Sequence, residues 1–297
     1  ADDLLATICL ATAAPIAIAP AMNQQMWQAS ATQYNIARLT ERGVTVWGPG
    51  IGDQACGDVG PGRMLEVAEL VELTTAFFQP RLLEGQHWVI TAGPTQEAID
   101  PVRYISNHSS GKMGYAIAKA AYDAGAKVTL ISGPVDIEPS KGVEHQSVTS
   151  ALDMHQAALA LAPSATVFIA CAAVADYRVD QIATQKIKKS SDNMQINLVK
   201  NPDIVADVAA LPDKPFTVGF AAETQDVVQY AKGKLTNKKL DLIAANNVAI
   251  AGQGFGSDNN ALTVIGKSLE QQLPLSNKAQ LATELIHIIQ QQLDANQ

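Results

Sequence analysis

The chain has 297 residues, of which 47% are hydrophobic and 17% charged, and its formal net charge is −8. This length suits about two domains that each bury a core. An acidic chain without a basic tract is a poor candidate for nucleic-acid binding, although backbone N–H groups and a few lysines can still bind anions in a local pocket. The three cysteines, Cys9, Cys56 and Cys171, are too few for a disulfide framework and favour a cytoplasmic protein.

The first region, up to about Phe78, consists of short segments. Residues 4–21 are apolar but lack a basic flank, and Pro15 and Pro20 interrupt them, so we expect neither a signal peptide nor a membrane span. Strand patterns at 17–19 and 44–47 precede a Gly-rich loop at 48–62, a helix at 65–78 and a linker at 79–85. Because the chain opens in the middle of this pattern, we expect a fragment of a longer protein.

The second region alternates strands with helices. The expected strands are 87–91, 127–132, 167–172, 217–221 and 242–245, and the expected helices are 111–125, 151–162, 202–211 and 227–239. This alternation predicts an α/β fold with a Rossmann-like, mainly parallel sheet covered by helices on both faces. Ligands bind beyond the carboxyl ends of such strands, so the loops after Thr91, Ala172, Ala221 and Ala245 are the informative ones.

Two glycine-containing strings resemble nucleotide-binding motifs, but neither satisfies the full motif. The string GIGDQA at 50–55 is followed by Gly57, Gly60 and Gly62, so no helix can begin where a dinucleotide fingerprint requires one. The string SSGKM at 109–113 lacks the earlier glycine of a phosphate-binding P-loop and has Met113 where that motif has Ser or Thr.

Other polar residues stand where an anionic ligand could bind. Residues 106–111 supply small side chains and N–H groups at a helix N-terminus, which suits an anion, although a simple N-cap would have the same composition. Asp176 and Arg178 follow a buried strand. Lysines occur at 186, 188 and 189, and also as the i, i+4 pair Lys234 and Lys238, but lysines of either kind are more often plain solvated surface.

Taken together, these strings resemble the bifunctional coenzyme A biosynthesis family of bacteria, and the resemblance spans essentially the whole chain. It is carried by PAMNQQMW at 20–27, QACGDVGPGRM at 54–64, TAGPTQE at 91–97, DPVRYISNHSSGKMG at 100–114, VFIACAAVADYR at 167–178 and KIKK at 186–189. That family joins phosphopantothenoylcysteine decarboxylase, a lyase, to phosphopantothenate–cysteine ligase. The resemblance implies a multifunctional enzyme with a decarboxylase part at 1–80 and a ligase domain at 81–297.

The resemblance also implies the ligase chemistry and its residues. The family couples 4′-phosphopantothenate to L-cysteine with CTP and Mg²⁺ through an acyl-cytidylate. In this sequence Asn107 would contact the acyl intermediate, and Lys186 would support the nucleotide and the first half-reaction. The implied CTP pocket, which also includes Lys186, consists of Ala170, Cys171, Ala172, Asp176, Pro202, Asp203, Ile204, Val205, Phe220, Lys234 and Lys238. Metal ligands are not implied by any motif.

For the first region the resemblance implies the C-terminal part of an FMN-dependent decarboxylase, a flavoprotein-type α/β domain. Asn23 would lie in the substrate-binding motif, and Cys56 would donate a proton in the reductive step. No histidine precedes His87, although the family's decarboxylase has a catalytic histidine in an early segment. We therefore expect these residues alone to lack decarboxylase activity, and a longer gene product to have it.

The partners implied are small molecules, with no nucleic acid or membrane, in a homo-oligomer built from ligase dimers and decarboxylase trimers. Two other interpretations stay open from the residues themselves. The ligase-like domain could be a nucleotide-binding module without catalysis, or a dehydrogenase with an unusual cofactor loop. Asn107 and the lysine cluster favour the ligase, since hydride transfer needs neither.

Overall fold

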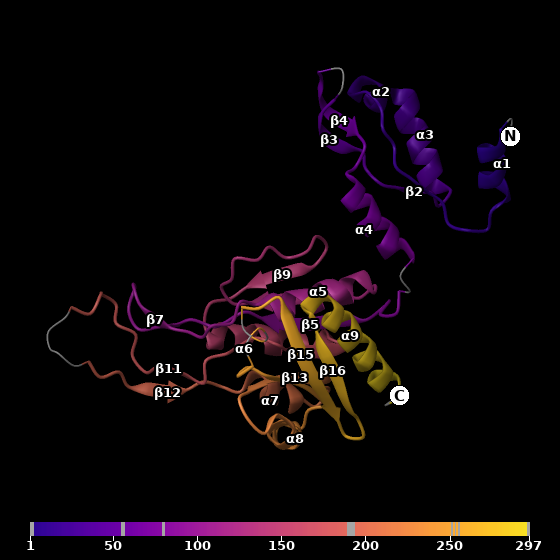
Figure 1. Cartoon of the computed structure of the whole chain (residues 1–297). Coiled ribbons are helices and arrows are strands. Elements are labelled where there is room, and N and C mark those ends of the chain that lie inside the picture. Colours follow the sequence, from indigo (N-terminus) through magenta and orange to yellow (C-terminus); the bar gives the residue numbers. More distant parts are fainter. Residues whose placement is uncertain are drawn as a thin grey trace. The chain divides into compact units, whose positions relative to one another are not determined.

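The structure is a computed structural model that describes residues 3–54, 57–78, 81–188, 194–250, 252, 254 and 256–295. The chain folds as two compact units, Ala1–Gln79 and Pro80–Gln297 (Figure 1). Within the described part of the chain, no helix is both long and apolar enough to cross a membrane. Each unit is described by itself.

The first unit contains two small strand pairs and several helices. Its elements are α1 (Leu4–Ala11), β1 (Ala17–Ile18), α2 (Gln24–Gln28), α3 (Ser30–Glu41), β2 (Thr45–Val46), β3 (Gly50–Asp53), β4 (Val59–Arg63) and α4 (Val67–Phe78). Strands β1 and β2 pair in parallel, as the two strand patterns allow. Helices α1, α3 and α4 bury no side chain, so this unit contributes little to the hydrophobic core.

The expectation of a plain Gly-rich loop at 48–62 is wrong, because β3 and β4 form an antiparallel hairpin there. Glycine is required in this hairpin because other atoms pack closely against the backbone, and not because the backbone must be flexible. A Cβ on Gly62 would collide with the backbone carbonyl oxygen of Met22, and Gly62 has φ +142°. The glycines that suggested a loop therefore lie in two strands, and α2 packs closely against this hairpin. The hairpin also confirms that no dinucleotide-type helix begins after Gly52.

The described residues of the second unit form an eight-stranded sheet in the order β16-β15-β14-β13-β10-β5-β8-β9. The strands are β5 (His87–Ala92), β8 (Lys127–Ser132), β9 (Glu144–Ser147), β10 (Val167–Ala170), β13 (Phe216–Glu223), β14 (Leu242–Asn247), β15 (Asn259–Gly266) and β16 (Glu270–Asn277). In this order, all strands from β14 through to β9 pair in parallel with their neighbours. Strands β15 and β16 add an antiparallel edge. The predicted α/β class and mainly parallel sheet are confirmed.

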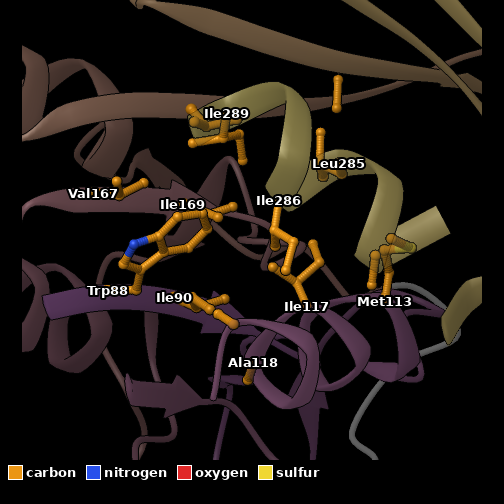
Figure 2. Close-up of a cluster of buried hydrophobic side chains, with 14 of the residues drawn as sticks. Trp88, Ile90, Met113, Ile117, Ala118, Val167, Ile169, Leu285, Ile286 and Ile289 are labelled. Atoms are coloured by element: carbon orange, nitrogen blue, oxygen red, sulfur yellow. The ribbon is translucent and has the colours of Figure 1, made fainter. Parts of the chain in front are cut away.

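Helices cover both faces of this sheet. Helices α5 (Lys112–Asp123) and α9 (Lys278–Asp294) pack on one face, where Trp88, Ile90, Ile117 and Leu285 belong to one buried cluster (Figure 2). Helices α6 (Ala151–Leu161), α7 (Ile204–Ala209) and α8 (Val227–Asn237) pack on the other face. The short 3-10 helix η1 (Ala162–Ser164) follows α6. Successive residues of β5 alternate between the two clusters, as the pleat of a strand requires.

One close contact fixes α5 on the sheet. A Cβ on Gly114 would lie 2.6 Å from the Cβ of Ala92, so only glycine allows the helix to approach β5 at this point. The N-terminus of α5 is therefore held at the carboxyl end of the central strands, where the loops that follow β5, β10, β13 and β14 also lie.

Two small antiparallel pairs leave the body of this unit. They are β6 (Glu97–Ala98) with β7 (Tyr104–Ile105), and β11 (Tyr177–Val179) with β12 (Leu198–Lys200). Figure 1 shows β7, β11 and β12 extending away from the eight-stranded sheet. We call the segment from β11 to β12 the arm. Neither pair was expected from the sequence.

Candidate functional site

Two adjacent cavities lie at the carboxyl edge of the parallel strands. The first has a volume of about 280 Å³ and the second about 190 Å³. Four residues, Ala172, Val174, Asp176 and Phe220, line both of them. This shared wall makes the two cavities neighbouring parts of one site, at the edge that the α/β topology predicts.

The first cavity contains the N-terminus of α5. Gly111 is the N-cap and has φ +76°, a left-handed conformation that other residues rarely adopt. Glycine has no side chain with which to cap the helix, so the first N–H groups stay open toward the cavity formed by Ser109, Ser110 and Gly111. Such a helix end is a ready binding site for an anion such as a phosphate.

Three lysines line the first cavity: Lys112, Lys234 and Lys278. The Nζ of Lys112 lies 2.6 Å from Asp258 Oδ1, and the Nζ of Lys234 lies 2.6 Å from Glu223 Oε1. The Lys112 ammonium lowers the pKa of the Asp258 carboxyl. The cavity thus combines an open helix N-terminus with several ammonium groups, which suits a chain of phosphates.

The second cavity is built around the start of α7. Asp203 is the N-cap, and its side chain accepts a hydrogen bond from the Ala206 N–H at 3.2 Å and pairs with Lys238 Nζ at 2.8 Å. Asn201 is buried, and its amide donates to the Ala175 carbonyl at 2.8 Å. Residues 202–205 line this small polar recess together with Phe220.

Every residue of the expected CTP pocket other than Lys186 lines one or both cavities. These residues come from four separate stretches of sequence: Ala170, Cys171, Ala172, Asp176, Pro202, Asp203, Ile204, Val205, Phe220, Lys234 and Lys238. Lys234 in α8 lines the first cavity, and Lys238, the C-cap of that helix, lines the second.

Cys171 lies on the wall of the first cavity as a neutral thiol. Burial raises its pKa to about 12. A thiol in this state is a weak nucleophile and packs as a small apolar group. Cys171 therefore contributes to this wall as a packing residue.

Asn107 bridges two of the loops at the sheet edge. Its side-chain NH₂ donates to the carbonyl of Ala173, and its Oδ1 accepts from the N–H of Ser109 at 3.0 Å. The residue therefore joins the loop after β10 to the loop before α5. Ser109 and Ala173 line the first cavity, so Asn107 supports this part of its wall through its two hydrogen bonds.

Lys186 lies elsewhere, on the arm. Its side chain is exposed and does not line either cavity. The neighbouring Ile187 is fixed, because its N–H donates to Asp100 Oδ2 at 3.1 Å. The Arg103 guanidinium beside Asp100 holds the pKa of that buried carboxyl well below its usual range. The arm is thus attached at Ile187, one residue from Lys186.

Four polar side chains that line the first cavity were missed in the sequence: Lys112, Lys278, Asn246 and Asn260. Lys112 belongs to the SSGKM string. Because that string does not satisfy the P-loop motif, Lys112 was not predicted as a site residue. Asn246 is the penultimate residue of β14 and donates to Asn260 Oδ1 at 3.3 Å, a pairing that no sequence spacing reveals. Lys278 begins α9, a helix that was not expected.

In the first unit, Asn23 is the N-cap of α2. Its Oδ1 accepts from the Gln25 N–H at 2.8 Å, and its NH₂ donates to Asp58 at 3.1 Å. The side chain thereby ties α2 to the loop between β3 and β4. Cys56, the other expected decarboxylase residue, lies outside the described residues.

Comparisons with known proteins agree on one family. Residues 83–293 match the family model of the DNA/pantothenate metabolism flavoprotein C-terminal domain, and residues 1–79 match the flavoprotein model. The coenzyme A biosynthesis bifunctional protein of Vibrio cholerae is 59% identical over 295 residues, which cover 98% of this chain and 74% of that protein. Its counterpart in Escherichia coli is 53% identical over 291 residues, covering 96% of this chain and 72% of that protein.

A solved structure supports the same assignment for the second unit. The C-terminal domain of a coenzyme A biosynthesis bifunctional protein superposes with a TM-score of 0.63 at 38% identity, covering 72% of this chain and 99% of that domain. The resemblance expected from the motifs is confirmed: the chain belongs to the family of coenzyme A biosynthesis bifunctional proteins, with a flavoprotein part followed by the C-terminal domain of that family.

Proposed function

We propose that the second unit is a phosphopantothenate–cysteine ligase of coenzyme A biosynthesis that uses CTP. The observation that carries this proposal is the pair of adjoining cavities at the sheet edge. The second cavity suits a nucleoside, and the first, with the α5 N-terminus and its lysines, suits the phosphate chain. The shared wall at Asp176 and Phe220 is where the α-phosphate would lie.

The reaction has two displacements. A carboxylate oxygen of 4′-phosphopantothenate forms a bond to the α-phosphorus, and the bond from that phosphorus to the bridging oxygen breaks, so pyrophosphate leaves with the electron pair. The amine of L-cysteine then attacks the acyl carbon, the C–O bond to the phosphate breaks, CMP leaves, and the amine loses a proton. Preorganised N–H groups and ammonium groups aid such steps because negative charge develops on the leaving groups.

Lys186 and Asn107 keep their proposed roles in these steps. Lys186 would stabilise the charge of the leaving pyrophosphate, which requires the arm to bring its exposed ammonium to the nucleotide. Asn107 would act through the loops that it joins, since both ends of its amide are already bound to Ala173 and Ser109. Its proposed contact with the acyl intermediate would need one of these hydrogen bonds to be shared.

Mg²⁺ fits this site only together with the nucleotide. Among the described residues, no group of three or more His, Cys, Asp or Glu side chains is placed to hold a metal ion. Mg²⁺ is commonly held by one or two carboxylates and by substrate phosphates. Asp176, which lines both cavities, is the residue suited to meet such an ion, and the ion would neutralise phosphate charge.

The test of the ligase proposal is pyrophosphate release. The protein is incubated with 4′-phosphopantothenate, L-cysteine and either CTP or ATP at subsaturating concentrations. We expect faster turnover with CTP, because the residues that line the second cavity include most of those that the family resemblance assigns to a CTP pocket. Equal turnover with both nucleotides would contradict the nucleotide choice. Calorimetry separates the other interpretations, since binding of CTP without turnover indicates a binding module and binding of NADPH indicates a dehydrogenase.

For the first unit we propose a part in the decarboxylation of 4′-phosphopantothenoylcysteine, with FMN as the flavin. The described residues of this unit do not by themselves enclose an isoalloxazine ring, because α1, α3 and α4 bury no side chain and Leu4, Leu5 and Val67 are more than 70% exposed. Asn23 and Cys56 keep their proposed roles in substrate binding and proton donation. Cys56→Ser should leave ligation unchanged, and a large loss of amide formation in a folded variant would show that this assignment is wrong.

The proposed assembly is a homo-oligomer with ligase dimers. Size measurement of the protein in solution by light scattering tests it.

A further inference from the structure

Lys278 is a buried lysine at the wall of the first cavity. It is only 7% exposed, and it is the first residue of α9, directly after the N-cap Asn277. Its ammonium donates to the carbonyl of Gly254 at 3.0 Å and to the carbonyl of Ser257. Its own N–H donates to the carbonyl of Asp258 at 3.0 Å. Both ends of the residue are therefore fixed to the segment that precedes β15.

The charge of Lys278 lacks a carboxylate partner in the described part of the chain. The other two lysines of this cavity are paired, Lys112 with Asp258 and Lys234 with Glu223. Burial, and after it the nearby Lys112 ammonium, lower the pKa of Lys278, and the smaller opposing effect of Asp258 does not cancel them. Two carbonyls satisfy hydrogen bonds but do not neutralise a buried positive charge.

The position of Lys278 in α9 adds to this imbalance. The N-terminus of a helix carries partial positive charge, so a cation in the first turn is placed unfavourably. A lysine that served only to hold the Gly254 and Ser257 carbonyls could be replaced by a neutral donor. An ammonium also has three N–H groups, of which two are used here, so one remains for a group in the cavity.

We propose that Lys278 binds the distal phosphates of the nucleotide, the part that leaves as pyrophosphate. This inference rests on the proposed CTP-dependent function. The distal end follows from the cavities, because Lys278 lines the first cavity and is not among the residues that line the second, nucleoside-sized one. Together with the uncapped N–H groups of the first turn of α5, which lines the same cavity, its ammonium completes a cationic recess for two phosphates.

The test compares CTP, CMP and inorganic pyrophosphate by calorimetry on the full chain. Lys278→Gln removes the charge but keeps an NH₂ group that can donate to the two carbonyls. We expect the Kd for CTP to rise roughly 10- to 100-fold, as for loss of a charge-assisted hydrogen bond. Binding of CMP should stay within about twofold, and pyrophosphate binding should be lost. Lys267→Met, at an exposed lysine outside both cavities, is the matched control and should change none of these.

The outcomes separate the interpretations. If Lys278→Gln weakens CTP and CMP equally, or changes neither, Lys278 does not bind the distal phosphates and the inference is overturned. If the wild-type protein does not prefer CTP to CMP, the proposed function fails, and the inference with it.

A second measurement avoids the need for a stable Gln variant. In ¹⁵N NMR of the wild-type protein, the lysine ammonium signal that is missing from Lys278→Arg belongs to Lys278. Pyrophosphate should shift this signal and CMP should not. An unshifted signal at saturating pyrophosphate would overturn the inference.

Discussion

Asn107→Asp tests whether the loops at the sheet edge serve the reaction. The substitution keeps the shape of the side chain and the acceptor for the Ser109 N–H, but replaces the NH₂ that donates to Ala173 with an oxygen. Two oxygens then face each other, and one of them is charged. Loss of one partner from a half-buried pair costs about 1–3 kcal/mol. In a unit of this size that corresponds to a fall in Tm of roughly 2–4 °C for each kcal/mol.

The effect on catalysis should be larger than this stability loss suggests. Ala173 belongs to the wall of the first cavity, and a displacement of about 1 Å at a reacting group can slow a reaction on the order of 100-fold. We expect Asn107→Asp to form the acyl-cytidylate and then to transfer it slowly to cysteine.

The assay is rapid-quench analysis with CTP and 4′-phosphopantothenate, with and without cysteine, beside a thermal unfolding curve. His108→Ala, at the exposed neighbouring residue, serves as the control. Normal turnover of Asn107→Asp with cysteine would refute the reasoning and leave Asn107 as a purely structural bridge.

Three further predictions concern packing, pH and the arm. Gly114→Ala should destabilise the second unit by about 1–3 kcal/mol in urea unfolding, because the new Cβ would lie 2.6 Å from Ala92, whereas Gly233→Ala, with nothing within 4 Å, should be neutral or slightly stabilising. Asp100 has a depressed pKa in the folded state, so its contribution to stability is complete above the unfolded pKa near 3.9 and is lost as the pH falls below it; Asp100→Asn should flatten the loss of Tm below about pH 4. Lys186→Gln should slow acyl-cytidylate formation on the order of 100-fold without changing Tm, since the side chain is exposed, and a wild-type rate would contradict its role.

The core of the second unit was predictable because its central strands consist mostly of apolar residues. Strands β5, β8 and β10 are buried on both faces, so four to six consecutive apolar or small residues indicate them without reference to the rest of the fold. The carboxyl edge of the sheet follows from the order of strands and helices, which is why the loops after Thr91 and Ala172 do lie at the cavities.

The edges of the sheet could not be predicted in the same way. All four residues of β9 are exposed, and β16 reads EQQLPLSN with a single buried residue, Leu273, so neither has an apolar pattern. Their pairing is decided by neighbouring strands and not by their own composition. Helix α9 differs, because Leu281, Leu285 and Ile289 recur at helical spacing and could have been recognised from the sequence.

The lysines of the site show where sequence reasoning reaches its physical limit. Lys234 and Lys238 were identified through spacing and resemblance, but their state depends on acids that are distant in sequence, Glu223 and Asp203. Each of these pairs orients an ammonium toward a cavity and lowers the cost of holding it partly buried before the ligand arrives. Because an ammonium has three N–H groups, a phosphate can bind without displacing the carboxylate. The site therefore enters the reaction already oriented, with Lys278 as the unneutralised charge among the described lysines of the first cavity.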